Sequence, residues 1–329
     1  MHDLEIDRIV KIIKDRRYRV IGLQLPEGLK DSATEIADTI RDKTGCDVVI
    51  SADPCYGACD LADSAMKRIG ADALFHFGHS PMFEKGALPV EYMPVQSDSD
   101  PVPLIRKHLD RFSKRVGLVT TIQHVHTLEK VKRLLEEEGF VVKIGKGGGR
   151  IKHDGQVLGC SFVSAVSVAD DVDSFIYIGS GNFHPLGVAL ATGKRTFAVD
   201  PLLREVRDMG PLKEKILRQR HARIAKARQG GTFGIIIGEK RGQMRKGLAF
   251  RLKKLIEGKG KRAYLLYLRE ITPENLLPFR KLDAFVNTAC PRVSIDDAAR
   301  FKRPLLTPVE LEIVLGERGW GDYTLDEMS

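Results

Sequence analysis

The stretch RVIGLQLPEGLKDSATEIA, residues 19–37, decides the fold of this chain. Its apolar start, Arg19–Leu25, is typical of a buried strand, and the loop PEGLK follows it. Ser32 and Glu35 have the spacing of a capping box, which predicts a helix that begins at Ser32. A strand, a loop and a helix in this order indicate an α/β fold built on parallel sheets.

The same order of elements occurs three times, with a period of about 100 residues. The expected strands are Arg19–Leu25, Asp47–Ser51, Ala73–Phe77, Arg115–Thr120, Phe140–Ile144, Ser174–Gly179, Thr196–Val199, Thr232–Gly238, Arg262–Leu268 and Asp283–Asn287. Helices are expected from Ser32 to Gly45, and at about Leu61–Arg68, Thr127–Glu138 and up to Glu257. The sequence therefore predicts three similar Rossmann-like lobes, 1–98, 99–204 and 205–329, around a pseudo-threefold axis.

Three cysteines lie just past expected strands or their extensions, each more than 100 residues from the next: Cys59, Cys160 and Cys290. Parallel sheets bind ligands outside the carboxyl ends of their strands, so lobes that face one another would bring these thiols together. A structural zinc ion usually takes four ligands from paired loops, and the chain has no second cysteine pair. A histidine (His79, His124 or His184) could complete a zinc site, and separated thiolates also suit an iron–sulfur cluster.

The other two cysteines are weaker candidates. Cys46 stands at a strand start and has the context of a small buried residue. Cys55 and Cys59 form C-x-x-x-C, half of the usual radical-SAM signature, but Ala62 occupies the place of the next cysteine. The glycines at 147–149 lack the frame of a phosphate-binding loop, so we interpret them as a turn.

Composition limits the class of protein. The chain has 329 residues, of which 43% are hydrophobic and 29% charged, as expected of a soluble globular protein with two or three domains. Five cysteines without a secretory leader indicate the reducing cytoplasm. The segment MHDLEIDRIVKIIKDRR, residues 1–17, has the pattern of an amphipathic helix, and no apolar run is long enough to predict a membrane span.

Positive charge is concentrated between Pro201 and Arg262, where 19 Lys/Arg face 5 Asp/Glu, a net charge of +14. This basic segment is either a solvated helical linker or a surface for an anionic partner. The sequence contains no zinc finger, RNA-binding sheet motif or KH loop, so we expect no direct sequence-specific binding of nucleic acid.

Several motifs resemble those of the archaeal diphthamide synthases, the 2-(3-amino-3-carboxypropyl)histidine synthases. The matching stretches span nearly the whole chain: LQLPEGL from Leu23, YGACD from Tyr56, GSGNFHPLGVALATGK from Gly179, AVDP from Ala198, NTACPRVSID from Asn287 and RPLLTPVE from Arg303. The combination of YGAC with TACPRVSID is specific.

The resemblance implies that Cys59, Cys160 and Cys290, and not Cys55, hold a 4Fe–4S cluster. It implies a transferase that splits S-adenosylmethionine on the amino-acid side of the sulfonium and releases methylthioadenosine. The resulting 3-amino-3-carboxypropyl radical adds to a histidine of elongation factor 2, the first step of diphthamide biosynthesis. A homodimer and an external electron donor are implied as well.

Polar groups at the expected strand ends are candidates for binding S-adenosylmethionine. They are Gln24, Glu27, Gly28, Gln123, His124, Gly181, Asn182, His184 and Arg292. Each also has a local structural interpretation, such as a cap, a turn or a loop anchor. Two other functions stay open: a quinolinate-synthase-like dehydratase with the cluster as Lewis acid, and a zinc-stabilised scaffold without catalysis.

Overall fold

The structure, a computed structural model, describes residues 4–328 and contains three separate β-sheets. The first sheet is formed by β1 (Val20–Gln24), β2 (Asp47–Ile50), β3 (Ala73–Phe77) and β4 (Val90–Met93). The second is formed by β5 (Arg115–Thr120), β6 (Val141–Lys143), β7 (Ser174–Ile178), β8 (Arg195–Asp200) and β9 (Glu205–Asp208). The third is formed by β10 (Thr232–Gly238), β11 (Arg262–Leu268), β12 (Ala284–Asn287) and β13 (Leu305–Leu306).

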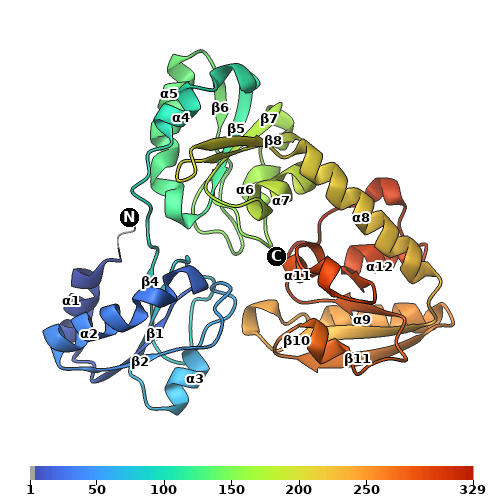
Figure 1. The fold of residues 1–329 in the computed structure, drawn as a ribbon, viewed down its shortest axis with the longest axis horizontal. Coiled ribbons are helices and arrows are strands. Elements are labelled where there is room, and N and C mark those ends of the chain that lie inside the picture. Colours follow the sequence, from blue (N-terminus) through green and yellow to red (C-terminus); the bar gives the residue numbers. More distant parts are fainter. Residues whose placement is uncertain (1–3, 329) are drawn as a thin grey trace.

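The threefold repeat is visible in the order of the strands. The three sheets read β2-β1-β3-β4, β6-β5-β7-β8-β9 and β11-β10-β12-β13, so that the first strand of each lobe always lies between the second and the third. All pairs are parallel except β8 with β9. The lobes lie at the corners of a triangle (Figure 1). The expected α/β fold of three similar parallel-sheet lobes is confirmed.

Helices pack on these sheets. They are α1 (Ile6–Arg16), α2 (Ala33–Thr44), α3 (Asp63–Arg68), α4 (Val102–Arg106), α5 (Leu128–Glu137), α6 (Val163–Val166), α7 (Phe183–Thr192), α8 (Gly210–Arg228), α9 (Lys246–Gly258), α10 (Pro273–Leu276), α11 (Pro291–Ile295) and α12 (Pro308–Val314). Strands β3, β7 and β12 are buried along their whole length, as expected of strands covered on both faces. Each sheet has its own hydrophobic cores, which is why each lobe is a packing unit.

Two details differ from the sequence-based expectations. Ser32 ends a 3₁₀ turn, η1 (Glu27–Ser32), that runs directly into α2, and its side chain makes no capping hydrogen bond. Because the chain is already helical at Ser32, the expected capping box does not form there. A capping box does form at α12, where Thr307 and Glu310 bond reciprocally.

The second sheet extends past the expected lobe boundary at residue 204. Strand β9 pairs with β8 in antiparallel register, so Glu205–Asp208 belong to the second sheet. We therefore move that proposed boundary to about residue 209, directly before α8. This helix links the second lobe to the third (Figure 1).

Candidate functional site

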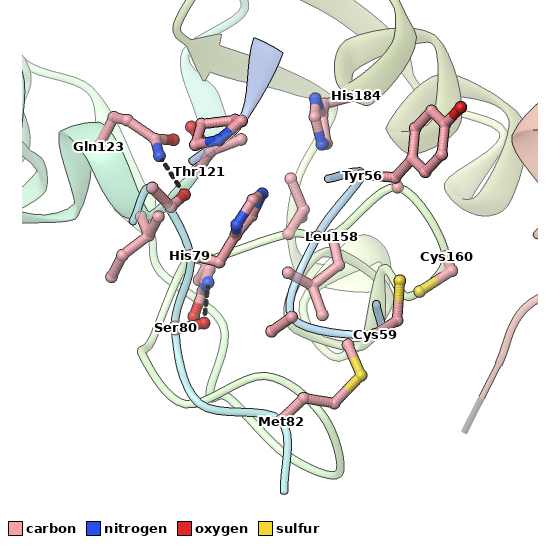
Figure 2. Close-up of a pocket in the computed structure, with 18 of the residues that line it drawn as sticks. Tyr56, Cys59, His79, Ser80, Met82, Thr121, Gln123, Leu158, Cys160 and His184 are labelled. Carbon is pink, nitrogen blue, oxygen red and sulfur yellow. Dashed lines mark hydrogen bonds between the residues drawn. The ribbon is translucent and has the colours of Figure 1, made fainter. Parts of the chain in front are cut away.

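Loops from all three lobes line a cavity of about 380 Å³. The lining loops follow β1, β2, β3 and β4 in the first lobe, β5, β6 and β7 in the second, and β12 in the third. These are the carboxyl ends of the strands, where open parallel sheets bind ligands. Figure 2 shows Cys59 and Cys160 close together at one side of this cavity, with His79, Ser80 and Gln123 toward the other.

The Cys59 loop is held from two lobes. Gln24, at the end of β1, donates from Nε2 to the Asp60 carbonyl at 2.7 Å and accepts from the Ala62 amide at 3.0 Å. From the third lobe, the Gly242 amide donates to the Cys59 carbonyl at 3.0 Å. A Cβ atom at Gly242 would lie 2.5 Å from the Cα atom of Cys59, so this close approach requires glycine.

The Cys160 loop is held by a segment far away in the chain. The Met328 amide donates to the Cys160 carbonyl at 2.7 Å, and Glu327 accepts from the Phe162 amide at 2.8 Å. Leu325, Asp326 and Met328 are buried in this position. Residues 325–328, which we call the tail segment, thus fix the loop that carries the second thiol.

The Cys290 loop joins β12 to α11. Asn287, at the end of β12, donates to the Cys290 carbonyl at 2.8 Å and accepts from the Ala289 amide at 2.9 Å. Arg245 donates from Nε to the Thr288 carbonyl at 2.6 Å and forms an ion pair with Asp326 of the tail segment. The tail segment therefore bridges the Cys160 and Cys290 loops.

The five cysteines are free and divide into two groups. Cys46 and Cys55 are buried and do not line the cavity, whereas Cys59, Cys160 and Cys290 are half-buried and do. Among residues 4–328, the one group of three His/Cys/Asp/Glu ligand atoms within 4.8 Å of one another is Cys55, His76 and His79. At least two of the three cavity sulfurs therefore lie more than 4.8 Å apart. The ligands of a single zinc ion, with bonds of about 2.3 Å, lie within ~4 Å of one another.

The three thiols are protonated in this environment and affect one another's ionisation. Burial raises the pKa of Cys160 to about 12 and of Cys290 to about 11, and it raises the pKa of Cys59 as well. Cys59 further raises the pKa of both other thiols, which shows that the three groups converge. A bound metal centre would stabilise the thiolates and release their protons, so these residues fit an iron–sulfur cluster.

Four of the nine residues expected to bind S-adenosylmethionine line the cavity: Gly28, Gln123, His184 and Arg292. Gln123 donates to the Gly78 carbonyl at 2.6 Å, which joins the first and second lobes. Arg292 lies over the Phe183 ring at 4.2 Å and pairs with Asp296 at 3.0 Å. Burial, with Arg292 nearby, lowers the pKa of His184 to about 3, so this imidazole is neutral.

The structure does not bring the other five to the cavity: Gln24, Glu27, His124, Gly181 and Asn182. Gln24 is buried and holds the Cys59 loop. Glu27 is exposed and pairs with Lys30 at 2.6 Å. His124 is buried inside the 3₁₀ turn η3 (Ile122–Thr127). Gly181 and Asn182 are exposed ahead of α7, and Asn182 is its N-cap residue, without a side-chain capping hydrogen bond.

Sequence reasoning did not single out several lining residues, among them Tyr56, Ser80, Thr121 and Gln156, although it expected the loops of Ser80 and Thr121 to converge. It considered His79 only as a zinc ligand. Tyr56, Ser80 and Thr121 follow the expected strands Asp47–Ser51, Ala73–Phe77 and Arg115–Thr120, so their position beyond a strand end was the available signal. Gln156 has no such signal, because the loop after β6 is long and its course depends on the tertiary structure.

Comparison with known proteins decides the family. The family model of the diphthamide synthesis protein matches residues 25–324. The chain belongs to this family. The 2-(3-amino-3-carboxypropyl)histidine synthase of Pyrococcus horikoshii is 37% identical, over 100% of this chain and 94% of the relative. Subunit 1 of the Caenorhabditis elegans synthase is 32% identical, over 95% of this chain and 80% of the relative.

The fold agrees with a solved member of the diphthamide synthesis family. The crystal structure of Dph2 from Pyrococcus horikoshii with a 4Fe-4S cluster superposes with a TM-score of 0.92 at 36% identity, covering 99% of this chain and 94% of that one. The family members named above are transferases, and this chain is an enzyme of that class. Between residues 4 and 328, no helix is long and apolar enough to cross a membrane.

Proposed function

We propose that this chain transfers the 3-amino-3-carboxypropyl group of S-adenosylmethionine to a histidine of elongation factor 2, the first step of diphthamide biosynthesis. The observation that carries the proposal is the meeting of three half-buried thiols, one from each lobe, on one cavity. The cluster in the Pyrococcus horikoshii structure supports the choice of cofactor. The names of the curated relatives support the choice of product.

In this proposal, Cys59, Cys160 and Cys290 hold a 4Fe–4S cluster and leave its fourth iron open to the cosubstrate. When bound, the cluster would supply the electron that breaks the sulfonium bond to the aminocarboxypropyl carbon, so that methylthioadenosine leaves. The electron comes from an external donor. The aminocarboxypropyl radical then forms a bond to an imidazole carbon of the target histidine, and this carbon gives up its proton and one electron, which returns to the oxidised cluster, so that the ring is aromatic again.

The residues of the chain determine which sulfonium bond breaks, because they fix the pose of the cosubstrate. Arg292 is the one charged side chain among the described residues that line the cavity, which makes it the partner of the methionyl carboxylate. Met82, Val95, Ile122 and Leu158 supply apolar lining that keeps water from a carbon radical.

The product distribution tests this function. Anaerobically prepared, cluster-loaded protein is reduced and mixed with S-adenosylmethionine, and the nucleosides are separated. We expect methylthioadenosine as the main product. 5′-Deoxyadenosine instead, or no cleavage, would contradict the proposed bond selectivity. A quinolinate-synthase-like dehydratase would give no cleavage, and a zinc scaffold would contain neither iron nor sulfide.

The factor needs a docking surface, and we place it on the exposed part of the basic segment. Exposed cations there include Lys215, Arg218 and Lys226 on α8, and Arg251 and Lys254 on α9. A homodimer in the cytoplasm is the assembly that we propose, and the five free cysteines support a reducing compartment. Charge reversal of the five exposed cations on α8 and α9 should weaken binding to the factor at low salt. Unchanged binding would remove this surface from the proposal.

A further inference from the structure

Three hydrogen-bonded side chains run from the first sheet to the cavity. The Oε1 atom of Gln24, at the end of β1, lies 2.9 Å from Nδ1 of His76. Nε2 of His76 in turn lies 2.9 Å from Nδ1 of His79. Gln24 and His76 are buried, and His79 lines the cavity. The mechanism above uses none of the three side chains.

Two backbone groups fix the orientation of the Gln24 amide. The Asp60 carbonyl can only accept, so the group 2.7 Å from it is the amide nitrogen. The Ala62 N–H can only donate, so the group 3.0 Å from it is the amide oxygen. The same oxygen faces His76, and therefore Nδ1 of His76 must carry a hydrogen and donate it.

The remaining hydrogens follow from burial. His76 is fully buried in β3, where an imidazolium would lack solvation, and desolvation lowers its pKa well below the ordinary value. A neutral His76 with its hydrogen on Nδ1 has a lone pair on Nε2, so Nδ1 of His79 must donate to it. Burial lowers the pKa of His79 to about 4, although a hydrogen bond with the Phe77 backbone opposes this effect, so this ring is neutral too. With its hydrogen on Nδ1, its lone pair is on Nε2.

This pair is not a metal site, although Cys55, His76 and His79 bring ligand atoms within 4.8 Å of one another. The two imidazole nitrogens lie 2.9 Å apart, which is hydrogen-bond distance. Tetrahedral Zn–N bonds of about 2.0–2.1 Å would separate them by ~3.3 Å. Both ring nitrogens of His76 are therefore already used in hydrogen bonds, one to Gln24 and one to His79.

The described lining of the cavity has no carboxylate that could bind an ammonium group. Of the described residues, no Asp or Glu lines it, and Arg292 is its one charged side chain. Apart from the three thiols, the acceptors that the lining side chains offer to an ammonium group are therefore neutral. Gln156 is not available, because its oxygen accepts from the Lys152 and His153 amides at 3.3 Å and its nitrogen donates to Ser80 at 2.8 Å. The His79 ring points into the space below His184 (Figure 2) and offers an acceptor that the Gln24–His76 chain fixes.

We propose that Nε2 of His79 accepts a hydrogen bond from the ammonium group at the amino-acid end of S-adenosylmethionine, and that Gln24 and His76 are positioning residues that fix its tautomer. This inference rests on the proposed function. It assigns the two charges of the amino-acid end to different residues, the carboxylate to Arg292 and the ammonium to His79. Such two-point recognition would fix how the sulfonium is turned toward the thiols.

Binding to the unreduced, cluster-loaded protein tests the proposal without catalysis. Calorimetry compares S-adenosylmethionine with methylthioadenosine, which has the same nucleoside and S-methyl group but a neutral thioether in place of the sulfonium and no amino-acid end. Replacing His79→Phe keeps an aromatic ring and removes the acceptor. We expect the affinity for S-adenosylmethionine to fall about 10- to 100-fold, as for the loss of a hydrogen bond to a charged group. The affinity for methylthioadenosine should change by less than about twofold, since its contacts persist.

A second variant separates the lost acceptor from a damaged fold. His79→Gln places an amide oxygen near the same point and should restore most of the affinity, with the iron content of the wild type. Equal losses for both ligands, or no loss in His79→Phe, would overturn the assignment to His79. If the wild-type protein itself does not prefer S-adenosylmethionine to methylthioadenosine, the proposed function fails instead.

Discussion

One aspartate has the same place in all three lobes, directly before the third strand: Asp72, Asp173 and Asp283. Oδ2 of Asp72 accepts from the Arg19 and Val20 amides at 2.7 and 3.0 Å, at the start of β1. Oδ2 of Asp283 accepts from the Gly231 and Thr232 amides, both at 2.9 Å, at the start of β10. The carboxylates of Asp72 and Asp283 thus connect the third strand of their lobe to the first.

The backbone amides lower the pKa of Asp72 below its ordinary value. The carboxylate therefore stabilises the fold above the pKa of the unfolded chain, and this contribution is lost as the pH falls through the native pKa. We predict that Asp72→Asn lowers the denaturant midpoint at pH 7 and that its difference from the wild type shrinks below about pH 3.8. Denaturation followed by circular dichroism between pH 2.5 and 7 measures this. A midpoint difference that stays constant with pH would show that the charge of Asp72 has no role. The control is Asp110→Asn, which changes an aspartate on an exposed turn.

Arg220 shows that the basic segment is partly structural. It is 1% exposed, and its guanidinium meets both oxygens of Glu310, which is 0% exposed, as well as the Ser294 and Leu305 carbonyls. The helix α8 is thereby fixed to α11, which follows Cys290, and to α12. Net charge along the sequence could not distinguish this buried cation from the exposed ones around it.

Replacing Arg220→Met leaves the Glu310 carboxylate buried without its cation. We predict a loss of about 3–5 kcal/mol in the stability of the third lobe. Thermal unfolding followed by circular dichroism measures the shift. Arg218→Met, on the exposed face of α8, should cost less than about 1 kcal/mol. If both variants unfold alike, the ion pair does not hold α8 in place.

Among the elements, the tail segment is the one that connects two of the thiol loops. Asp326 pairs with Arg245, which holds the Thr288 carbonyl, and the Met328 amide holds the Cys160 carbonyl. We predict that Asp326→Ala weakens iron retention against a chelator by about 10- to 100-fold, the range for groups that orient metal ligands. Anaerobic titration of the loaded protein with a ferrous chelator measures it. The control is Asp322→Ala, which changes an exposed residue four positions earlier and should retain iron like the wild type. Equal iron retention in the two variants would show that the tail segment does not position the thiol loops.

Elements with a strong pattern were predictable from the sequence. The limits of β3, β5, β10 and β11 agree with the expected strands, because these are continuous apolar runs bounded by polar turns. Strands β4, β9 and β13 were missed, since they are short and gain their stability from neighbours rather than from their own composition. The helix at His184 was missed for a related reason, because Pro185 suggested a loop although proline is well tolerated in the first turn of a helix.

For the whole molecule, the repeat was visible in the sequence and led us to expect that the lobes converge, but the distances between the thiols were not predictable. Spacing alone left zinc and a cluster open, because distances along the chain say nothing about distances between sulfurs. The positions of the thiol loops depend on tertiary contacts that no local sequence pattern encodes. Gly242 packs on Cys59, and the Met328 amide donates to the Cys160 carbonyl. The hydrogen bonds of Gln24 to the Asp60 carbonyl and the Ala62 amide likewise explain why this residue, two before Pro26 of the PEGL loop, supports a thiol loop and does not line the cavity.

The central claim is that one thiol from each lobe holds a shared 4Fe–4S cluster, and iron and acid-labile sulfide counted per chain test it most directly. The wild-type protein, reconstituted without oxygen, should contain about four of each. Cys59→Ala, Cys160→Ala and Cys290→Ala should each lose most of both, whereas Cys55→Ala, which changes a buried thiol outside the cavity, should keep them. A full complement of iron and sulfide in any of the first three variants, or its loss in Cys55→Ala alone, would contradict the account.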